Sequence, residues 1–159
     1  KLAKAAVSLF QPLLRALFPV LCRAWLENPS HALKIWRWTV LLTLVCATVG
    51  FSVAAGLGGW LLERLFGGGW DAQLPLLLVF CGWILFALLS VVCGLLGLIA
   101  AGHRSTFSEI TLWTTLVQLV LIVVGAATAD AMGMAVALTC SEGLRCAALM
   151  YAARRHITT

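Results

Sequence analysis

Charged residues are scarce in this sequence, and carboxylates are especially few. Only 11% of the 159 residues are charged, against about 25% in an ordinary soluble domain. Asp and Glu together number 6 and are spread along the chain, so paired carboxylates for acid and base catalysis are missing. The sequence also lacks HExxH, GxSxG and paired-Asp magnesium motifs, the usual signatures of hydrolases and transferases. We therefore expect that the protein is not an enzyme.

Metal-binding and disulfide patterns are missing as well. The 6 cysteines include no CxxC pair, and most of them fall within apolar runs. His31, His103 and His156 stand far apart in the sequence. Cysteines placed in this way pack as small polarizable side chains. We expect neither a metal site nor a cofactor.

The sequence is rich instead in long apolar runs. Hydrophobic residues make up 62% of the chain, and three charge-free windows occur, each long enough to cross a hydrocarbon core of about 30 Å as a helix. A fourth window is interrupted only by Glu142 and Arg145. We therefore predict an all-α integral membrane bundle of four transmembrane helices in contact with membrane lipid. The predicted spans cover approximately residues 36–62, 72–102, 107–129 and 131–154.

Positive charge alternates from one predicted connection to the next. The net charge of +5 could suggest nucleic acid, but lysine and arginine gather before the first span, between the second and third, and after the fourth. Such a bias marks the cytoplasmic side of a membrane. We therefore expect a multi-pass protein with both termini of this segment in the cytoplasm, and no nucleic-acid partner. The basic residues on that side are Lys1, Lys4, Arg15, Arg23, Lys34, Arg37, Arg104, Arg154 and Arg155.

Residues 1–30 are predicted to form a region of their own before the bundle of residues 31–159. A polar stripe of helical spacing marks an otherwise apolar helix here. Pro12 and Pro19 each remove a backbone hydrogen bond, so we expect this helix to be kinked. Two interpretations stay open: an amphipathic helix on the cytoplasmic surface, or the inner end of a preceding membrane helix whose polar face lines a water-filled cavity. The stripe consists of Lys4, Ser8, Gln11 and Arg15.

A turn and a set of tryptophans follow this first helix. Asn28 or Ser30 can cap the next helix, since both side chains accept hydrogen bonds from the first backbone N–H groups. Trp36 and Trp38 are expected at the inner membrane interface and Trp60 at the outer one, where amphipathic indoles accumulate.

The second predicted span carries a face of small residues. Ser90 and Gly94 are one helical turn apart, as are Cys93 and Gly97. Small side chains let neighbouring helices approach closely. We interpret this face as a packing surface.

Two opposite charges stand within the fourth predicted span. Glu142 lies near its middle and Arg145 one turn closer to the cytoplasm, a spacing at which the two can form an ion pair. An uncompensated charge at that depth costs about 2.5 to 3.5 kcal/mol, so the pair should face protein or water. Only a short connection around Asp130 separates the third and fourth spans. We therefore expect an antiparallel hairpin that brings Gln118 to the depth of Arg145.

These three polar residues admit two interpretations. Gln118, Glu142 and Arg145 can satisfy one another as a buried structural cluster that holds the hairpin together. Alternatively, Glu142 or Arg145 lines a polar path for a substrate, because ionisable groups within a membrane often mark such paths. Both interpretations stay open.

Four passages form a pattern when they are read in order along the chain. They are residues 17–23 (LFPVLCR), 62–78 (LERLFGGGWDAQLPLLL), 94–104 (GLLGLIAAGHR) and 133–142 (GMAVALTCSE), followed by the basic pair Arg154 and Arg155. This ordered combination resembles the C-terminal part of polysaccharide exporters and lipid-linked oligosaccharide flippases. These proteins belong to the multidrug, oligosaccharidyl-lipid and polysaccharide exporter superfamily. The resemblance covers nearly the whole chain.

The resemblance implies a transporter of the bacterial inner membrane with two lobes of helices that open alternately to the two sides. Its substrate would be a polyprenyl-diphosphate-linked sugar, whose charge Lys4, Arg15 and Arg145 would offset. Glu142 would be the partner of Arg145 or a coupling site for a proton or sodium gradient. The chain begins at Lys1, and we expect it to be part of a longer protein that supplies the N-terminal lobe.

Two other functions stay open. A segment of a multidrug and toxin extrusion-type antiporter should carry acidic residues in its cavity for cationic drugs, and this segment offers basic ones instead. A non-transporting four-helix membrane scaffold or assembly subunit would need no substrate path at all. Several hundred upstream residues with further spans would exclude the scaffold.

Overall fold

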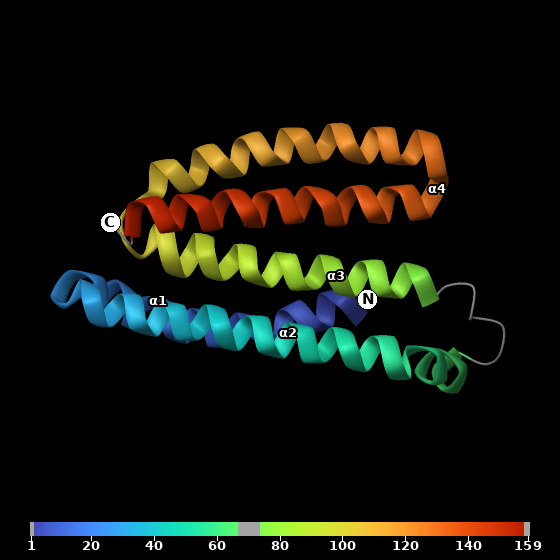
Figure 1. Cartoon of the computed structure of the whole chain (residues 1–159), viewed down its shortest axis with the longest axis horizontal. Helices are drawn as coiled ribbons and strands as arrows, with labels where there is room; N and C mark the ends of the chain where they lie inside the picture. Colours follow the sequence, from blue (N-terminus) through green and yellow to red (C-terminus); the bar gives the residue numbers. More distant parts are fainter. Residues whose placement is uncertain (1, 67–73, 158–159) are drawn as a thin grey trace.

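A computed structural model of the chain describes residues 2–66 and 74–157 (Figure 1). These residues are almost entirely helical and contain no strand, which confirms the predicted all-α class. The elements are α1 (Leu2–Glu27), α2 (Pro29–Phe66), α3 (Leu74–Val91), the π-helix η2 (Val92–Ile99) and α4 (Arg104–Ile157).

Three helical stretches within the described residues are long and apolar enough to cross a membrane. The structure therefore supports a membrane protein. The fourth predicted span, 131–154, is helical but is not among the three, because Glu142 and Arg145 lower its hydropathy. The three stretches are Pro29–Trp60, Leu74–Ile99 and Arg104–Ala127.

Helix α4 folds back on itself near residues 128–130, so its two halves lie side by side and antiparallel (Figure 1). A Cβ on Gly125 would lie 2.6 Å from the carbonyl oxygen of Gly133 and 3.0 Å from the Cβ of Ala137. In a straight helix, residues 125 and 133 would be about 12 Å apart. The expected hairpin is therefore present, and its turn is itself helical. We call residues 104–127 the outer segment of α4 and residues 131–157 its return segment.

Helix α1 runs without a break through Pro12 and Pro19, and the expected kink stays a prediction. Its second half packs against the core of the bundle through Leu14, Leu17 and Phe18. It contacts α2, α3 and η2, so this helix is part of the described bundle.

Asn28 caps the N-terminus of α2. The backbone N–H of His31 donates a hydrogen bond of 3.2 Å to Oδ1 of Asn28, the geometry of a helix N-cap. Ser30 Oγ donates to the same oxygen at 2.7 Å. Of the two capping candidates, Asn28 is therefore the cap, and Ser30 orients its side chain.

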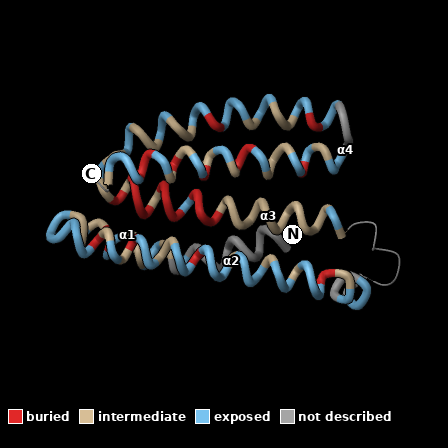
Figure 2. The backbone as a smooth tube through the Cα atoms, viewed as in Figure 1, coloured by how far each residue is buried: buried red, intermediate tan, exposed pale blue. Residues whose placement is uncertain are grey.

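Helices α3 and η2 form the centre of the bundle, with α1 and α2 on one side and the return segment of α4 on the other (Figure 1). Buried residues concentrate on η2 and on the end of α3 that leads into it (Figure 2). Helix α2 and the outer segment of α4 are mostly exposed along their apolar stretches, as helices facing lipid would be. The core therefore lies at the end of the bundle that holds the C-terminus.

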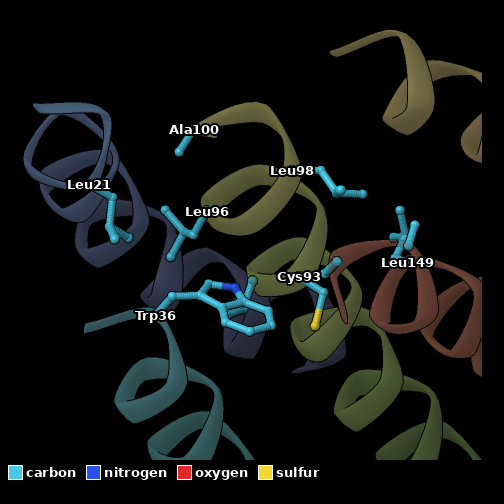
Figure 3. Close-up of a cluster of buried hydrophobic side chains, with 10 residues drawn as sticks. Leu21, Trp36, Cys93, Leu96, Leu98, Ala100 and Leu149 are labelled. Atoms are coloured by element: carbon cyan, nitrogen blue, oxygen red, sulfur yellow. The ribbon is translucent and has the colours of Figure 1, made fainter. Parts of the chain in front are cut away.

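The small-residue face of the second predicted span does pack, as expected. A Cβ on Gly94 would collide with the ring of Phe107, and one on Gly97 would lie 2.9 Å from Nε1 of Trp36. Trp36 is consequently only 5% exposed and belongs to the core (Figure 3). The glycine opposite leaves room for the indole, and the expected depth of Trp36 at the inner membrane interface stays a prediction. Trp38, at 70% exposed, is free to take an interfacial position.

Candidate functional site

The return segment of α4 presents one face to α3. Thr139 Oγ1 shares its proton between the carbonyl of Ala135, at 2.9 Å, and the carbonyl of Val79 in α3, at 3.2 Å. Gly143 lies against the ring of Phe86. Residues spaced alternately by four and three along this segment are buried or half-buried, the pattern of a helix seam. Glu142 is one of them and therefore faces the protein. The seam consists of Ala135, Thr139, Glu142, Cys146, Leu149 and Ala153.

Glu142 and Arg145 form the ion pair that their spacing predicts. Arg145 Nη1 lies 3.8 Å from Glu142 Oε1, and the two side chains are 27% and 7% exposed. This separation exceeds the range of about 2.7 to 3.2 Å for a hydrogen bond. Arg145 Nε is buried without a hydrogen-bond partner among the described residues. The pair is therefore a loose contact between a buried carboxylate and a partly exposed guanidinium.

Small polar side chains lie near Glu142, around the thiol of Cys146. Ser90 of α3 lies beside the thiol of Cys146, and Cys93 of η2 is near that thiol as well. Ser90 Oγ is buried and makes no hydrogen bond of good geometry to the residues that the structure describes. The region between α3 and the return segment therefore holds one carboxylate and unused hydrogen-bonding capacity.

Gln118 lies half-buried on the outer segment of α4. The close approach of Gly125 to Gly133 sets the register of the hairpin and puts Gln118 at a depth similar to that of Glu142. Within the described part of the chain, however, no hydrogen bond joins Gln118 to Glu142 or Arg145. The structure thus brings two of the three predicted cluster residues into contact and leaves the third unbonded.

Arg15 lines a groove of about 450 Å³ between α1 and the central helices. Arg15 is exposed and is the one charged residue of this groove, whose other lining residues are apolar. The side chains of Lys4 and Gln11, the other two predicted path residues of α1, lie outside the described residues. The groove is lined by Leu14, Arg15, Phe18, Ala87, Leu88, Val91 and Leu95.

Arg15 and the Glu142–Arg145 pair lie on opposite sides of α3. The Arg15 groove uses Leu88 and Val91 of that helix, whereas the return segment contacts it through Val79 and Phe86. At about 3.6 residues per turn these two sets fall on opposite faces of a helix about 10 to 12 Å wide. Arg15 of α1 and the pair on α4 therefore do not share one cavity in the described structure.

One contact between polar residues was not anticipated from the sequence. The rings of His103 and His156 lie 4.9 Å apart, centroid to centroid, and are tilted by 36°. They join the connection before α4 to the end of its return segment. In the sequence, both residues stand next to basic residues that the charge pattern assigns to the same side of the membrane. That assignment was the only indication that the two could be close. Among the described residues, no group of three or more His, Cys, Asp or Glu side chains could hold a metal ion.

Comparisons with protein-family models, with curated proteins and with solved structures found no match to this chain. The function is therefore inferred from its own residues.

Proposed function

We propose that this chain is part of a multi-pass transporter of a bacterial inner membrane that flips or exports a lipid-linked oligosaccharide or polysaccharide by alternating access. The observation that carries this proposal is the groove between α1 and α3, in which Arg15 is the one charged residue among apolar ones. A polyprenyl-diphosphate-linked sugar presents the matching chemistry, a doubly charged headgroup on a hydrocarbon chain. Arginine binds phosphate oxygens through its planar fork of N–H donors.

The charge distribution supports the proposed orientation. Arg15 belongs to the positively charged side of the chain, which the positive-inside rule places in the cytoplasm. Arg15 lies 12 residues, about 18 Å, before the end of α1 at Glu27, so a lipid-linked sugar that enters from the cytoplasm would meet it within the groove. The return segment of α4 is the fourth span of this proposal, and a further lobe of helices from the same protein would close the substrate path on the other side.

Glu142 supplies a coupling site in this proposal. Its carboxylate is buried and has Arg145 as its ion partner at 3.8 Å. Binding of a proton or a sodium ion would weaken that attraction and loosen the seam between α3 and the return segment. An ion gradient could thereby bias the two states of the transporter, since a ligand shifts an equilibrium only through its different affinity for the two states.

The experiment compares translocation by the full-length protein and its variants in proteoliposomes that carry the lipid-linked sugar. Arg15→Gln removes the charge from the groove, and Arg23→Gln removes an equally exposed charge of α1 that does not line it. We expect translocation to fall at least tenfold in the first variant and less than twofold in the second. Equal rates in both variants would contradict the assignment of the groove.

A second set of variants addresses the coupling site. Glu142→Gln should retain substrate binding and lose the dependence of transport on the ion gradient. If transport by Glu142→Gln depended on the ion gradient as in the unmodified protein, the pair with Arg145 would have only a structural role. Export of a cationic drug in place of the sugar would favour the multidrug antiporter, and intact protein without any transport would favour the scaffold.

A further inference from the structure

A second groove, of about 680 Å³, runs along α2 on the side that faces α1. We call it the α1–α2 groove. It shares no residue with the groove of Arg15. Its lining consists of Leu17, His31, Lys34, Ile35, Trp38, Thr39, Leu42, Thr43 and Cys46.

The length of the α1–α2 groove matches one leaflet of a bilayer. From His31 to Cys46, α2 rises by about 22 Å at about 1.5 Å per residue. Half of a hydrocarbon core is about 15 Å, and the headgroup region adds the remainder. With the start of α2 at the cytoplasmic surface, as the positive-inside rule expects, a groove of this length would extend from the headgroups of that leaflet to the bilayer midplane.

Charge is confined to one end of this groove. His31 and Lys34 are exposed at the end that begins α2. Farther along, Trp38 and Leu42 provide apolar walls. The hydroxyl of Thr43, which also lines the groove, already donates to the carbonyl of Thr39 at 2.8 Å, so it has no proton left to donate. The groove thus has basic residues at one end and mainly apolar walls along the rest of its length.

We infer that the α1–α2 groove binds an anionic phospholipid of the cytoplasmic leaflet. Its phosphate lies against Lys34 and His31, and one acyl chain lies along α2 toward Cys46. Basic sites between membrane helices on the cytoplasmic side suit anionic headgroups, and the lysine ammonium acts on phosphate as a point charge. This inference does not depend on the proposed transport function.

The occupant has to match both parts of the groove. A hydrocarbon chain suits the apolar walls that Trp38 and Leu42 form. The basic end further favours an amphiphile with an anionic headgroup over a purely apolar molecule.

Native mass spectrometry of the detergent-solubilised full-length protein tests this site with phosphatidylglycerol and phosphatidylcholine as probes. We expect phosphatidylglycerol to be retained at least fivefold more than phosphatidylcholine. Lys34→Gln should lower its retention about fivefold, the effect of one basic residue near a charged headgroup. Arg64→Gln is the matched control, because Arg64 is an exposed cation at the opposite end of α2.

The apolar part of the site has its own pair of variants. Leu42→Trp fills the groove and should lower phosphatidylglycerol retention, whereas Val45→Trp places the same ring on an exposed position of α2 outside the groove. Circular dichroism of each variant verifies that the helices are intact. Equal retention of the two lipids, or equal effects of Lys34→Gln and Arg64→Gln, would overturn the inference. A dimer that excludes lipid from the groove would overturn it as well.

Discussion

Gly125 lies so close to Gly133 that a Cβ on Gly125 would come within 2.6 Å of the Gly133 carbonyl oxygen. This approach locks the two halves of α4 together near the fold-back. The oxygen belongs to the backbone, so it cannot move aside as a flexible side chain would. The hairpin therefore depends on the absence of a side chain at position 125.

Gly125→Ala should destabilise the hairpin by about 1 to 3 kcal/mol, the usual cost of overpacking. Gly56→Ala is the control, because nothing lies within 4 Å of a Cβ at that exposed position of α2. There the alanine should be neutral or slightly stabilising, since it raises helix propensity. Unfolding of both variants in mixed micelles, followed by circular dichroism, measures the difference. Equal midpoints would show that the fold-back tolerates a side chain.

Asn28→Ala should destabilise the start of α2 by about 1 kcal/mol, because the N–H of His31 loses its side-chain acceptor and keeps only its bond of 3.1 Å to the backbone carbonyl of residue 28. Ser30→Ala removes the donor that orients Asn28 and should cost less, since the cap itself remains. Hydrogen exchange at residues 30–33 reports the local opening. A larger effect of Ser30→Ala than of Asn28→Ala would contradict the assignment of Asn28 as the cap.

Thr139→Val should weaken the contact between α3 and the return segment by about 0.6 kcal/mol, an average value for a hydrogen bond between membrane helices. The one proton of the Thr139 hydroxyl is shared between the carbonyl of Ala135 in its own helix, at 2.9 Å, and the carbonyl of Val79 in α3, at 3.2 Å. The value of about 0.6 kcal/mol is therefore an upper bound. Thr115→Val is the control, because the Thr115 hydroxyl donates only within its own helix, to the carbonyl of Thr111 at 2.7 Å. The unfolding midpoints of the two variants should differ. Identical midpoints would show that the bond between Thr139 and Val79 does not stabilise the packing of α3 on the return segment.

Local features of the fold could be predicted from the sequence. Helical class, the fold-back around Asp130 and the pairing of Glu142 with Arg145 depend on spacing along one segment, so the sequence alone specifies them. The choice of Asn28 over Ser30 as the cap depends on where α2 begins, which is at Pro29, and helix ends are hard to fix to one residue from a sequence.

Relations between helices could not be predicted in the same way. Trp36 points into the core because Gly97 lies opposite, and the sequence does not reveal which residues of different helices meet. The π-helix η2 was not anticipated either, since its wider turn has no clear local signal. For the same reason, the resemblance could imply that Arg15 and Arg145 offset the charge of one substrate without showing where the two residues lie relative to each other. Helical spacing shows on which face of its own helix each arginine lies. It does not show on which side of α3 that face is packed.

Glu142→Ala tests whether the ion pair between Glu142 and Arg145 stabilises the fold. The substitution leaves the guanidinium of Arg145 without its carboxylate, and breaking a buried pair costs about 3 to 5 kcal/mol. The loss here should be smaller, about 1 to 3 kcal/mol, because the Arg145 side chain is 27% exposed and the contact is 3.8 Å long. Arg145→Met in the same chain should recover part of that loss, since the double variant leaves no unpaired charge. A double-mutant cycle of unfolding free energies measures this coupling, and strictly additive effects would mean that the two charges do not stabilise one another.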